Sequence, residues 1–330
     1  MGMVNDKIFP YCHERKKEYK EEIIMERAEK DVFYAQSYEP KFGNLHFHTE
    51  HSDNMRSVET VVKLAKEEGY KGLGITDHDT ITGWGEFREI CQQEGMEYIL
   101  GAEFYGRAFD LPFHLVSYDF DPENERVKAL LEDGKEREQY ATRTRFEMGV
   151  ERGTIKGITW EEVLEYNKGI NFIYHAHVSR AMVAKGVLTA EEKKTFRADN
   201  FARTIAIPPF RKAPDVKEIV EIVKEAGGVT FMAHPSFNSR EEYMEPLIEL
   251  GIQGIELWHP SNHGWVYEKI EELIAKHNLY TGGGTDHHGY MEGCPFYEVG
   301  SEKNRERSIP RAMFGVSEAH FRQLKERALG

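Results

Sequence analysis

Two histidines open the first group of residues that could do chemistry. The stretch GNLHFHTEHSDN, residues 43–54, places His46 and His48 two positions apart in a short run with strand character. Side chains at positions i and i+2 of a strand point to the same face, so the two imidazoles could chelate one cation. A polar strand end whose histidines face water could have the same sequence. The rest of the chain must therefore distinguish a metal site from a solvated strand end.

Similar residues occur in or directly after the other segments with strand character. The candidate ligands are His46, His48, Asp53, His78, Glu103, His114, His234, Asp286 and His288. In parallel α/β folds, functional groups collect at the C-terminal ends of strands. A single such residue would be an ordinary core histidine, but strands rarely carry imidazoles and carboxylates at six separate ends by accident.

These residue types indicate which metals could bind. Histidine and carboxylate ligands without cysteine suit Mn²⁺, Fe²⁺ or Zn²⁺ rather than a structural thiolate zinc. Nine candidates exceed what one ion can use, which predicts two or three divalent metal ions that share a bridging carboxylate. Neighbouring metals polarise a phosphoryl oxygen and lower the pKa of a bound water, so the pattern predicts a hydrolase.

Strands and helices alternate around these residues. Strand character is found at 44–48, 71–76, 96–103, 112–118, 229–234, 252–259 and 279–288, and helical segments at 57–69, 84–95, 215–228, 241–251 and 264–277. This alternation predicts parallel strands joined by crossover helices. Residues 121–207 are helical and highly charged, and we interpret them as an inserted helical subdomain. The predicted organisation is a helical extension (1–40), a discontinuous α/β domain (41–120 and 208–300), the insertion (121–207) and a polar C-terminal tail (301–330).

Composition limits the possible partners. The chain has 330 residues and a formal net charge of -14, which argues against an extensive nucleic-acid-binding surface. A compact phosphorylated ligand remains compatible, since metal cations reverse the local sign of charge. We expect no membrane span and no secretory signal. Three widely spaced cysteines, Cys12, Cys91 and Cys294, favour a reduced, cytoplasmic protein.

The motifs together resemble the polymerase and histidinol phosphatase (PHP) family of phosphoesterases. NLHFHTEHSDN is similar to its first motif, with Asn44 where many members have Asp, and GITDHDTITG, GAE, MAHP and GGTDHHG are similar to later ones. The resemblance spans residues 43–289 and implies a distorted, TIM-like (β/α)7 barrel. It also implies a trinuclear centre with the nine ligands, Glu103 as the bridging carboxylate and a metal-bridging hydroxide as nucleophile. Asp286 would complete the catalytic ligand set, and Asp77 would orient a ligand histidine.

The branch that the chain resembles most contains nucleoside 3',5'-bisphosphate phosphatases, cyclic phosphodiesterases and short-RNA exonucleases. Its insertion carries an Arg-Pro-His-Ile-Ala-Arg-like motif, where this chain has YHAHVSRAM. His177 and Arg180 match, and the resemblance implies catalytic and phosphate-binding roles for them, but His175 stands where arginine is usual. Arg211 and Lys212 could supply replacement cations, or form a solvated basic patch.

For four other histidines the sequence gives less information about their role. His259 and His263 are expected to line the substrate pocket rather than bind metal, whereas His51 and His287 are expected outside the site.

Three functions follow from this sequence. The first is metal-dependent hydrolysis of a small phosphorylated metabolite, such as a nucleoside bisphosphate, sugar phosphate or cyclic phosphate. The second is 5'→3' exonuclease action on short RNA, and the third is a non-catalytic, metal-bound PHP module. The sequence leaves open the physiological substrate, the native metal, the general acid and the oligomeric state.

Overall fold

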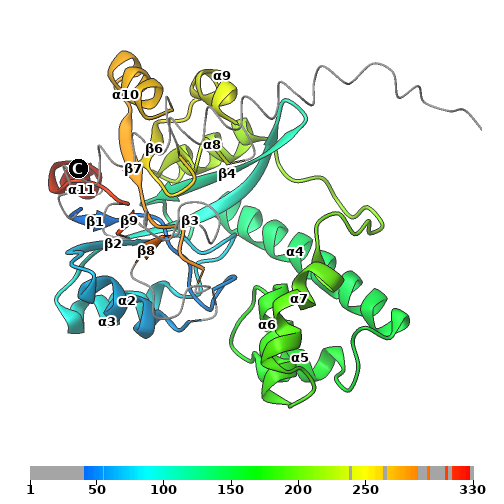
Figure 1. The fold of residues 1–330 in the computed structure, drawn as a ribbon. Coiled ribbons are helices and arrows are strands. Elements are labelled where there is room, and N and C mark those ends of the chain that lie inside the picture. The colour runs from blue at the N-terminus through cyan, green and yellow to red at the C-terminus, as the bar shows by residue number, and fades with distance from the viewer. Residues whose placement is uncertain are drawn as a thin grey trace, which may run out of the picture.

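Seven strands form one sheet that curls almost into a closed barrel (Figure 1). The computed structural model describes residues 41–54, 56–237, 240–262, 266–288, 296–297, 309–310 and 314–327. The strands, in sheet order, are β1 (Gly43–Asn44), β2 (Gly72–Ile75), β3 (Glu97–Ala108), β4 (Leu111–Tyr118), β5 (Val229–Met232), β6 (Gly254–Trp258) and β7 (Tyr280–Gly283). Beyond the first and last strands the chain closes the ring, because Leu45 N–H donates to Gly283 O at 3.1 Å and Phe47 pairs with His287.

One strand departs from the predicted parallel arrangement. β4 runs antiparallel to both β3 and β5, whereas the other pairs are parallel. Only Phe109 and Asp110 connect β3 to β4, and both have positive φ (52° and 59°). Such a two-residue turn joins antiparallel strands, because a parallel crossover needs a dozen residues or more.

Helices cover the outside of the barrel as the apolar stripes predicted. They are α2 (Val58–Glu67), α3 (Trp84–Glu94), α8 (Val216–Glu225), α9 (Met244–Glu249), which follows the 3₁₀ turn η1 (Glu241–Tyr243), and α10 (Val266–His277). In α2 the buried residues are Val58, Val61, Val62 and Ala65, the stripe that the sequence indicates. α2 and α3 lie on one side of the barrel and α8, α9 and α10 on the other (Figure 1).

The insertion is a helical block beside the barrel, built from α4 (Glu125–Arg152), α5 (Trp160–Tyr166), α6 (His175–Ala184) and α7 (Ala190–Phe201) (Figure 1). It has its own apolar core around Phe146, Trp160 and Val178. Helix α4 approaches the barrel closely at Gly134, where an added Cβ would lie 2.3 Å from Cγ of Asp79. This contact holds the insertion over the C-terminal end of β2.

The end of the chain contributes to the barrel. Within the described residues of the expected polar tail, Val316 exchanges backbone hydrogen bonds with Gly43, and helix α11 (Glu318–Arg327) buries Phe321 and Leu324. The short strands β8 (Phe296–Tyr297) and β9 (Ile309–Pro310) pair with each other. The expected extension 1–40 lies outside the described residues. No helix in the described part of the chain combines the length and apolar composition needed to cross a bilayer.

Candidate metal centre

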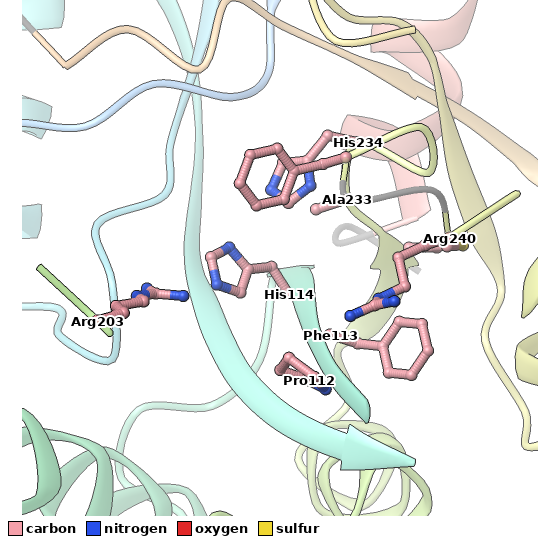
Figure 2. Close-up of a pocket in the computed structure, with 9 residues that line it drawn as sticks. Pro112, Phe113, His114, Arg203, Ala233, His234 and Arg240 are labelled. Atoms are coloured by element: carbon pink, nitrogen blue, oxygen red, sulfur yellow. The ribbon is translucent and has the colours of Figure 1, made fainter. Parts of the chain in front are cut away.

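Glu103 lies in the middle of the candidate site, on β3, and is buried. Its Oε1 lies 3.0 Å from His114 Nδ1 and 3.0 Å from His234 Nε2. His114 comes from β4 and His234 directly follows β5, and Figure 2 shows the two rings beside each other. One carboxylate oxygen is therefore shared by two imidazoles from neighbouring strands.

The second oxygen of Glu103 faces three more histidines. Oε2 lies 3.0 Å from His78 Nδ1, 3.3 Å from His48 Nε2 and 3.4 Å from His46 Nε2. The Nε2 atoms of His46 and His48 are 3.3 Å apart. The i, i+2 spacing thus does bring both imidazoles to one point, as the sequence predicted.

Two aspartates complete the cluster. Asp53 Oδ2 lies 3.1 Å from His288 Nε2 and 3.7 Å from His78 Nε2. Asp286 Oδ1 lies 3.1 Å from His48 Nε2 and 3.4 Å from His288 Nδ1. The structure therefore gathers all nine predicted ligand residues into one cluster, with Glu103 in the middle of the other eight.

The separations of these nitrogen and oxygen atoms match those of ligands around a shared divalent cation. Oε2 of Glu103 and Oδ1 of Asp53 are buried and accept no hydrogen bond, although nitrogens surround them. Two ligands bound to one ion at about 2.0–2.2 Å lie about 3.0–3.5 Å apart, which matches most of the separations above. Converging ligand atoms, two of which have no hydrogen-bond partner, are what a cation site needs, so the residues present fit the implied metals.

The backbone is strained where it delivers two of these residues. His234 and Asp286 both have positive φ, 30° and 49°, a region that residues other than glycine rarely adopt. Two residues before Asp286, Gly284 lets the chain pass so close to the segment after β1 that an added Cβ would lie 2.3 Å from His46 N. Strain of this kind persists where the surrounding structure enforces it, commonly at functional sites.

Glu256, on β6, is a site residue that the sequence analysis missed. Its Oε1 lies 2.8 Å from His46 Nδ1, and its Oε2 accepts the backbone N–H of His234 at 2.6 Å. A proton held on Nδ1 of His46 leaves the Nε2 lone pair directed at the cluster. The available signal was a carboxylate at the centre of the otherwise apolar strand GIELW.

Asp77 does not orient a ligand histidine directly, contrary to expectation. Its carboxylate accepts hydrogen bonds from Thr49 N at 2.7 Å, Thr49 Oγ1 at 2.7 Å and Ser52 Oγ at 2.6 Å. Asp77 therefore fixes the turn between His48 and Asp53, which sets the direction of both ligands from outside the cluster.

The electrostatics of the cluster keep its carboxylates ionised. Burial alone would raise the pKa of Glu103, but His78, His114 and His46 hold it well below its usual range. Burial likewise opposes the charge of Asp286, and neighbouring histidines lower its pKa well below the ordinary value. Both groups are thus negatively charged at neutral pH.

The histidines divide into two kinds. Burial lowers the pKa of His78 to about 3, despite Glu103 and Asp53 nearby. Burial also disfavours the charge of His48, but the neighbouring carboxylates of Asp286 and Glu103 raise its pKa to about 10. Protons held by such histidines must leave when a cation binds, so metal affinity at this cluster increases with pH.

His177 and Arg180 do not reach the cluster. Nδ1 of His177 accepts Tyr174 N–H at 2.9 Å, so its Nε2 carries the proton and donates to Glu50 O at 2.9 Å. Arg180 pairs with the Glu50 carboxylate at 2.8 Å. Both side chains contact Glu50 and so help to dock the insertion onto the loop after β1, while their catalytic and phosphate-binding roles stay predictions.

Two other arginines of the insertion, Arg197 and Arg203, line the cavity at the cluster. A cavity of about 380 Å³ is lined by the candidate ligands His78, Glu103, His114 and Asp286 and also by Tyr174, Arg197 and Arg203. Arg203 and Arg240 lie on opposite sides of His114 in Figure 2. Sequence analysis missed Arg197 and Arg203, because charged residues are common throughout this helical segment.

The remaining predicted residues lie apart from the cluster. Arg211 pairs with Asp133 and Glu136 of α4, and Arg211 and Lys212 line a separate cavity of about 410 Å³. His51 contacts Thr82 and Glu86.

Two pocket histidines were also predicted. His259 is buried, and because its Nδ1 accepts Ser261 N–H at 3.0 Å, its protonated Nε2 lies 3.5 Å from Asp286 Oδ2. His263 lies outside the described residues.

Comparison with known proteins decides the family. The sequence model for the PHP domain matches residues 44–205. The chain carries a PHP domain. Of the relatives, the phosphoribosyl 1,2-cyclic phosphate 1,2-diphosphodiesterase of Eggerthella lenta is 25% identical over 76% of this chain and 96% of its own length. The 5'-3' exoribonuclease Rnm of Salmonella typhimurium is 26% identical over 88% of this chain and 96% of its own length.

A solved structure agrees with these relatives. A candidate metal-dependent phosphoesterase from Bifidobacterium adolescentis superposes with a TM-score of 0.69 at 27% identity, covering 88% of this PHP chain and 98% of its own. The family and barrel-like fold expected from the motifs are therefore confirmed. The chain carries a PHP domain, is similar to proteins named as a phosphodiesterase and a metal-dependent phosphoesterase, and has a His, Asp and Glu cluster that could bind metal.

Proposed function

We propose that this protein hydrolyses a small phosphorylated metabolite at a centre of two or three divalent ions, in the cytoplasm. The observation that carries the proposal is Glu103, whose two oxygens face five imidazoles at 3.0–3.4 Å while one of them accepts no hydrogen bond. The ions would be Mn, Fe or Zn, held by the nine clustered residues with Glu103 as the bridge.

Ions bound there would polarise the phosphoryl oxygens and supply a water of lowered pKa. Other residues of the chain hold the candidate ligands in the orientation that metal binding needs. Glu256 keeps His46 in the tautomer that presents Nε2, and Asp77 holds the turn that carries Asp53. Arg197 and Arg203, which line the same cavity as the ligands, would bind a second negatively charged group of the substrate.

A substrate with two phosphate groups fits this cavity best. The metal cluster would bind the scissile phosphate, and Arg197 and Arg203 would bind the other one. A nucleoside bisphosphate or a phosphorylated sugar with a second or cyclic phosphate belongs to this class. The second candidate is 5'→3' exonuclease action on short RNA, which the relative named as an exoribonuclease favours.

The test is phosphate release after reconstitution with Mn²⁺, Fe²⁺ or Zn²⁺, using nucleoside 3',5'-bisphosphates, sugar phosphates, cyclic phosphates and short 5'-phosphorylated RNA. We expect turnover of one class and a loss of at least about 1,000-fold in Asp286→Asn. The matched control is His277→Gln, a histidine of α10 that pairs with Glu245 outside the cluster. Near-normal turnover in Asp286→Asn, or a metal-loaded protein inert to the whole panel, would contradict the proposal.

A further inference from the structure

Glu138 of helix α4 lies beside the candidate metal centre without being one of its ligands. A single cavity of about 300 Å³ is lined by Glu138 together with His78 and His114, two of the candidate ligands. The Glu138 side chain is only partly buried. A substrate whose scissile phosphate lies at these ligands can therefore place its leaving group in the same cavity as the Glu138 carboxyl group.

One of the two carboxyl oxygens of Glu138 is already engaged and the other is not. Thr142, one turn further along α4, donates its hydroxyl to Oε1 of Glu138 at 3.1 Å. No residue that the structure describes forms a hydrogen bond or an ion pair with Oε2. If Glu138 carries a proton, Oε2 can donate it to an oxygen atom in the cavity.

The surroundings of Glu138 favour that proton at neutral pH. Burial raises the pKa of Glu138 to about 7, assisted by the charge of Asp53, whereas Arg203, the Thr142 hydroxyl and Arg145 oppose the shift. A general acid works best when its pKa lies near the working pH. The ionisable groups around Glu138 are Arg137 and Arg145 on α4, Arg203 after α7, Tyr174 before α6, Asp53 after β1, His78 and Asp79 after β2, Tyr105 on β3 and His114 on β4.

Two other acidic groups of this cavity are less suited to donate a proton to a substrate. Oδ1 of Asp79 accepts the Tyr105 N–H at 3.4 Å, and helix α4 packs so tightly on this side chain that a Cβ added to Gly134 would lie 2.3 Å from its Cγ. Burial raises the pKa of Tyr174 well above the ordinary phenol value, so its hydroxyl is a weak acid. Glu138 alone of the three combines an unengaged oxygen with a readily lost proton.

We propose that Glu138 is the general acid of the reaction and gives the proton on Oε2 to the leaving-group oxygen. This inference rests on the proposed phosphoester hydrolysis and adds a residue that the sequence leaves unidentified. Water adds its oxygen to phosphorus, the bond from phosphorus to the leaving group breaks, and the electron pair of that bond stays on the leaving oxygen. The Glu138 proton completes the released alcohol, and the proton lost by water restores Glu138. Arg203, which lines the same cavity, holds a second phosphate of the leaving group nearby.

The test compares two phosphate monoesters of similar size whose leaving groups differ in basicity. p-Nitrophenyl phosphate releases a weakly basic phenolate that needs no proton, whereas p-nitrobenzyl phosphate releases a strongly basic alkoxide that does. In the Mn²⁺-loaded protein, Glu138→Gln should lower kcat for the benzyl ester by about 100-fold or more and leave the phenyl ester within about threefold. The metabolite that the protein hydrolyses also leaves as an alkoxide, so its kcat should follow that of the benzyl ester.

The pH profile distinguishes an acid from a structural residue. In the wild-type protein, kcat for the benzyl ester and for the metabolite should fall as pH rises through the pKa of Glu138, and Glu138→Gln should lose this decline. Thr142→Val should move the decline to higher pH, because the hydroxyl stabilises the ionised form of Glu138. The matched control is Glu147→Gln, an exposed carboxylate of the same helix that pairs with Arg143, and it should change neither the rates nor the profile.

Carbon NMR tests the proton on Glu138 without any turnover. In the apo-protein labelled with ¹³C at glutamate carboxyl groups, the signal that is missing from Glu138→Gln should titrate near pH 7 rather than near the ordinary value of 4.5. Titration near 4.5, or equal losses on the two esters in Glu138→Gln, would overturn this inference and leave the proposed function intact. A wild-type protein that hydrolyses neither ester nor any metabolite of the panel would overturn the proposed function and this inference with it.

Discussion

Replacing Glu256 by glutamine should weaken metal binding without disrupting the barrel. The carboxylate is buried and accepts two N–H groups, from His46 Nδ1 at 2.8 Å and from the His234 backbone at 2.6 Å. Glutamine has the same shape but offers one acceptor and one donor, so one of these N–H groups would face an NH₂ group. If His46 responds by moving its proton to Nε2, it can no longer present a lone pair to a cation.

The expected size of this effect follows from these contacts. Losing one buried hydrogen-bond partner costs about 1–3 kcal/mol. Removal of a group that orients a ligand histidine typically weakens metal affinity by about 10–100-fold, or about 1.4–2.7 kcal/mol. We therefore expect Glu256→Gln to bind Mn²⁺ about 10–100-fold more weakly, with phosphate release recovering towards the wild-type level at saturating Mn²⁺.

The assay is a titration of the apo-protein with buffered Mn²⁺, followed by calorimetry and by phosphate release, with circular dichroism as a check of folding. Glu245→Gln is the control, since Glu245 pairs with Lys276 at the surface, and its affinity should be unchanged. Wild-type affinity in Glu256→Gln would refute the reasoning. A defect that saturating Mn²⁺ does not relieve would also refute it, because Glu256 would then act on the reaction itself.

Two further predictions concern stability. Burial raises the pKa of Asp119 to about 6, although Arg327 opposes the shift. Its stabilising contribution is full below the unfolded pKa of about 3.8 and is lost as pH rises through about 6, so Asp119→Asn should raise the free energy of unfolding at pH 8 by up to about 3 kcal/mol. Asp110→Asn, at an exposed site with similarly positive φ, should not, and equal gains in the two denaturation curves would contradict the burial argument. Gly134→Ala should cost about 1–3 kcal/mol and reduce turnover, because the new Cβ meets Asp79, whereas Gly85→Ala, with open space around it, should be neutral or stabilising in the same thermal melts. A neutral Gly134→Ala would mean that α4 does not need its close approach to the barrel.

The clustering of the candidate ligands was readable from the sequence because strand geometry is local. His46 and His48 share a face at spacing two, and the ends of successive strands meet at one edge of a barrel, so the sequence alone places Glu103 beside them. The antiparallel direction of β4 was missed because the predicted strands 96–103 and 112–118 are eight residues apart, and the two-residue connection follows only from the extension of β3 to Ala108.

The supporting residues could not be found in the same way. Glu256 acts through His46, which is 210 positions away in the sequence, and only folding brings them together. His177 and Arg180 were expected at a phosphate because their motif suggests it, but Glu50 provides a carboxylate and a carbonyl that bind both. Arg203 lies in a charged segment where no periodic pattern distinguishes a binding residue from a solvated one.

The proposed metal centre is tested most directly by the number of Mn²⁺ ions bound per chain, determined by elemental analysis after reconstitution and removal of free metal. We expect two or three ions in the wild-type protein and at most one in Glu103→Gln, because both carboxylate oxygens of Glu103 are shared between groups of histidines. One ion or none in the wild-type protein, or an unchanged number in Glu103→Gln, would contradict this expectation.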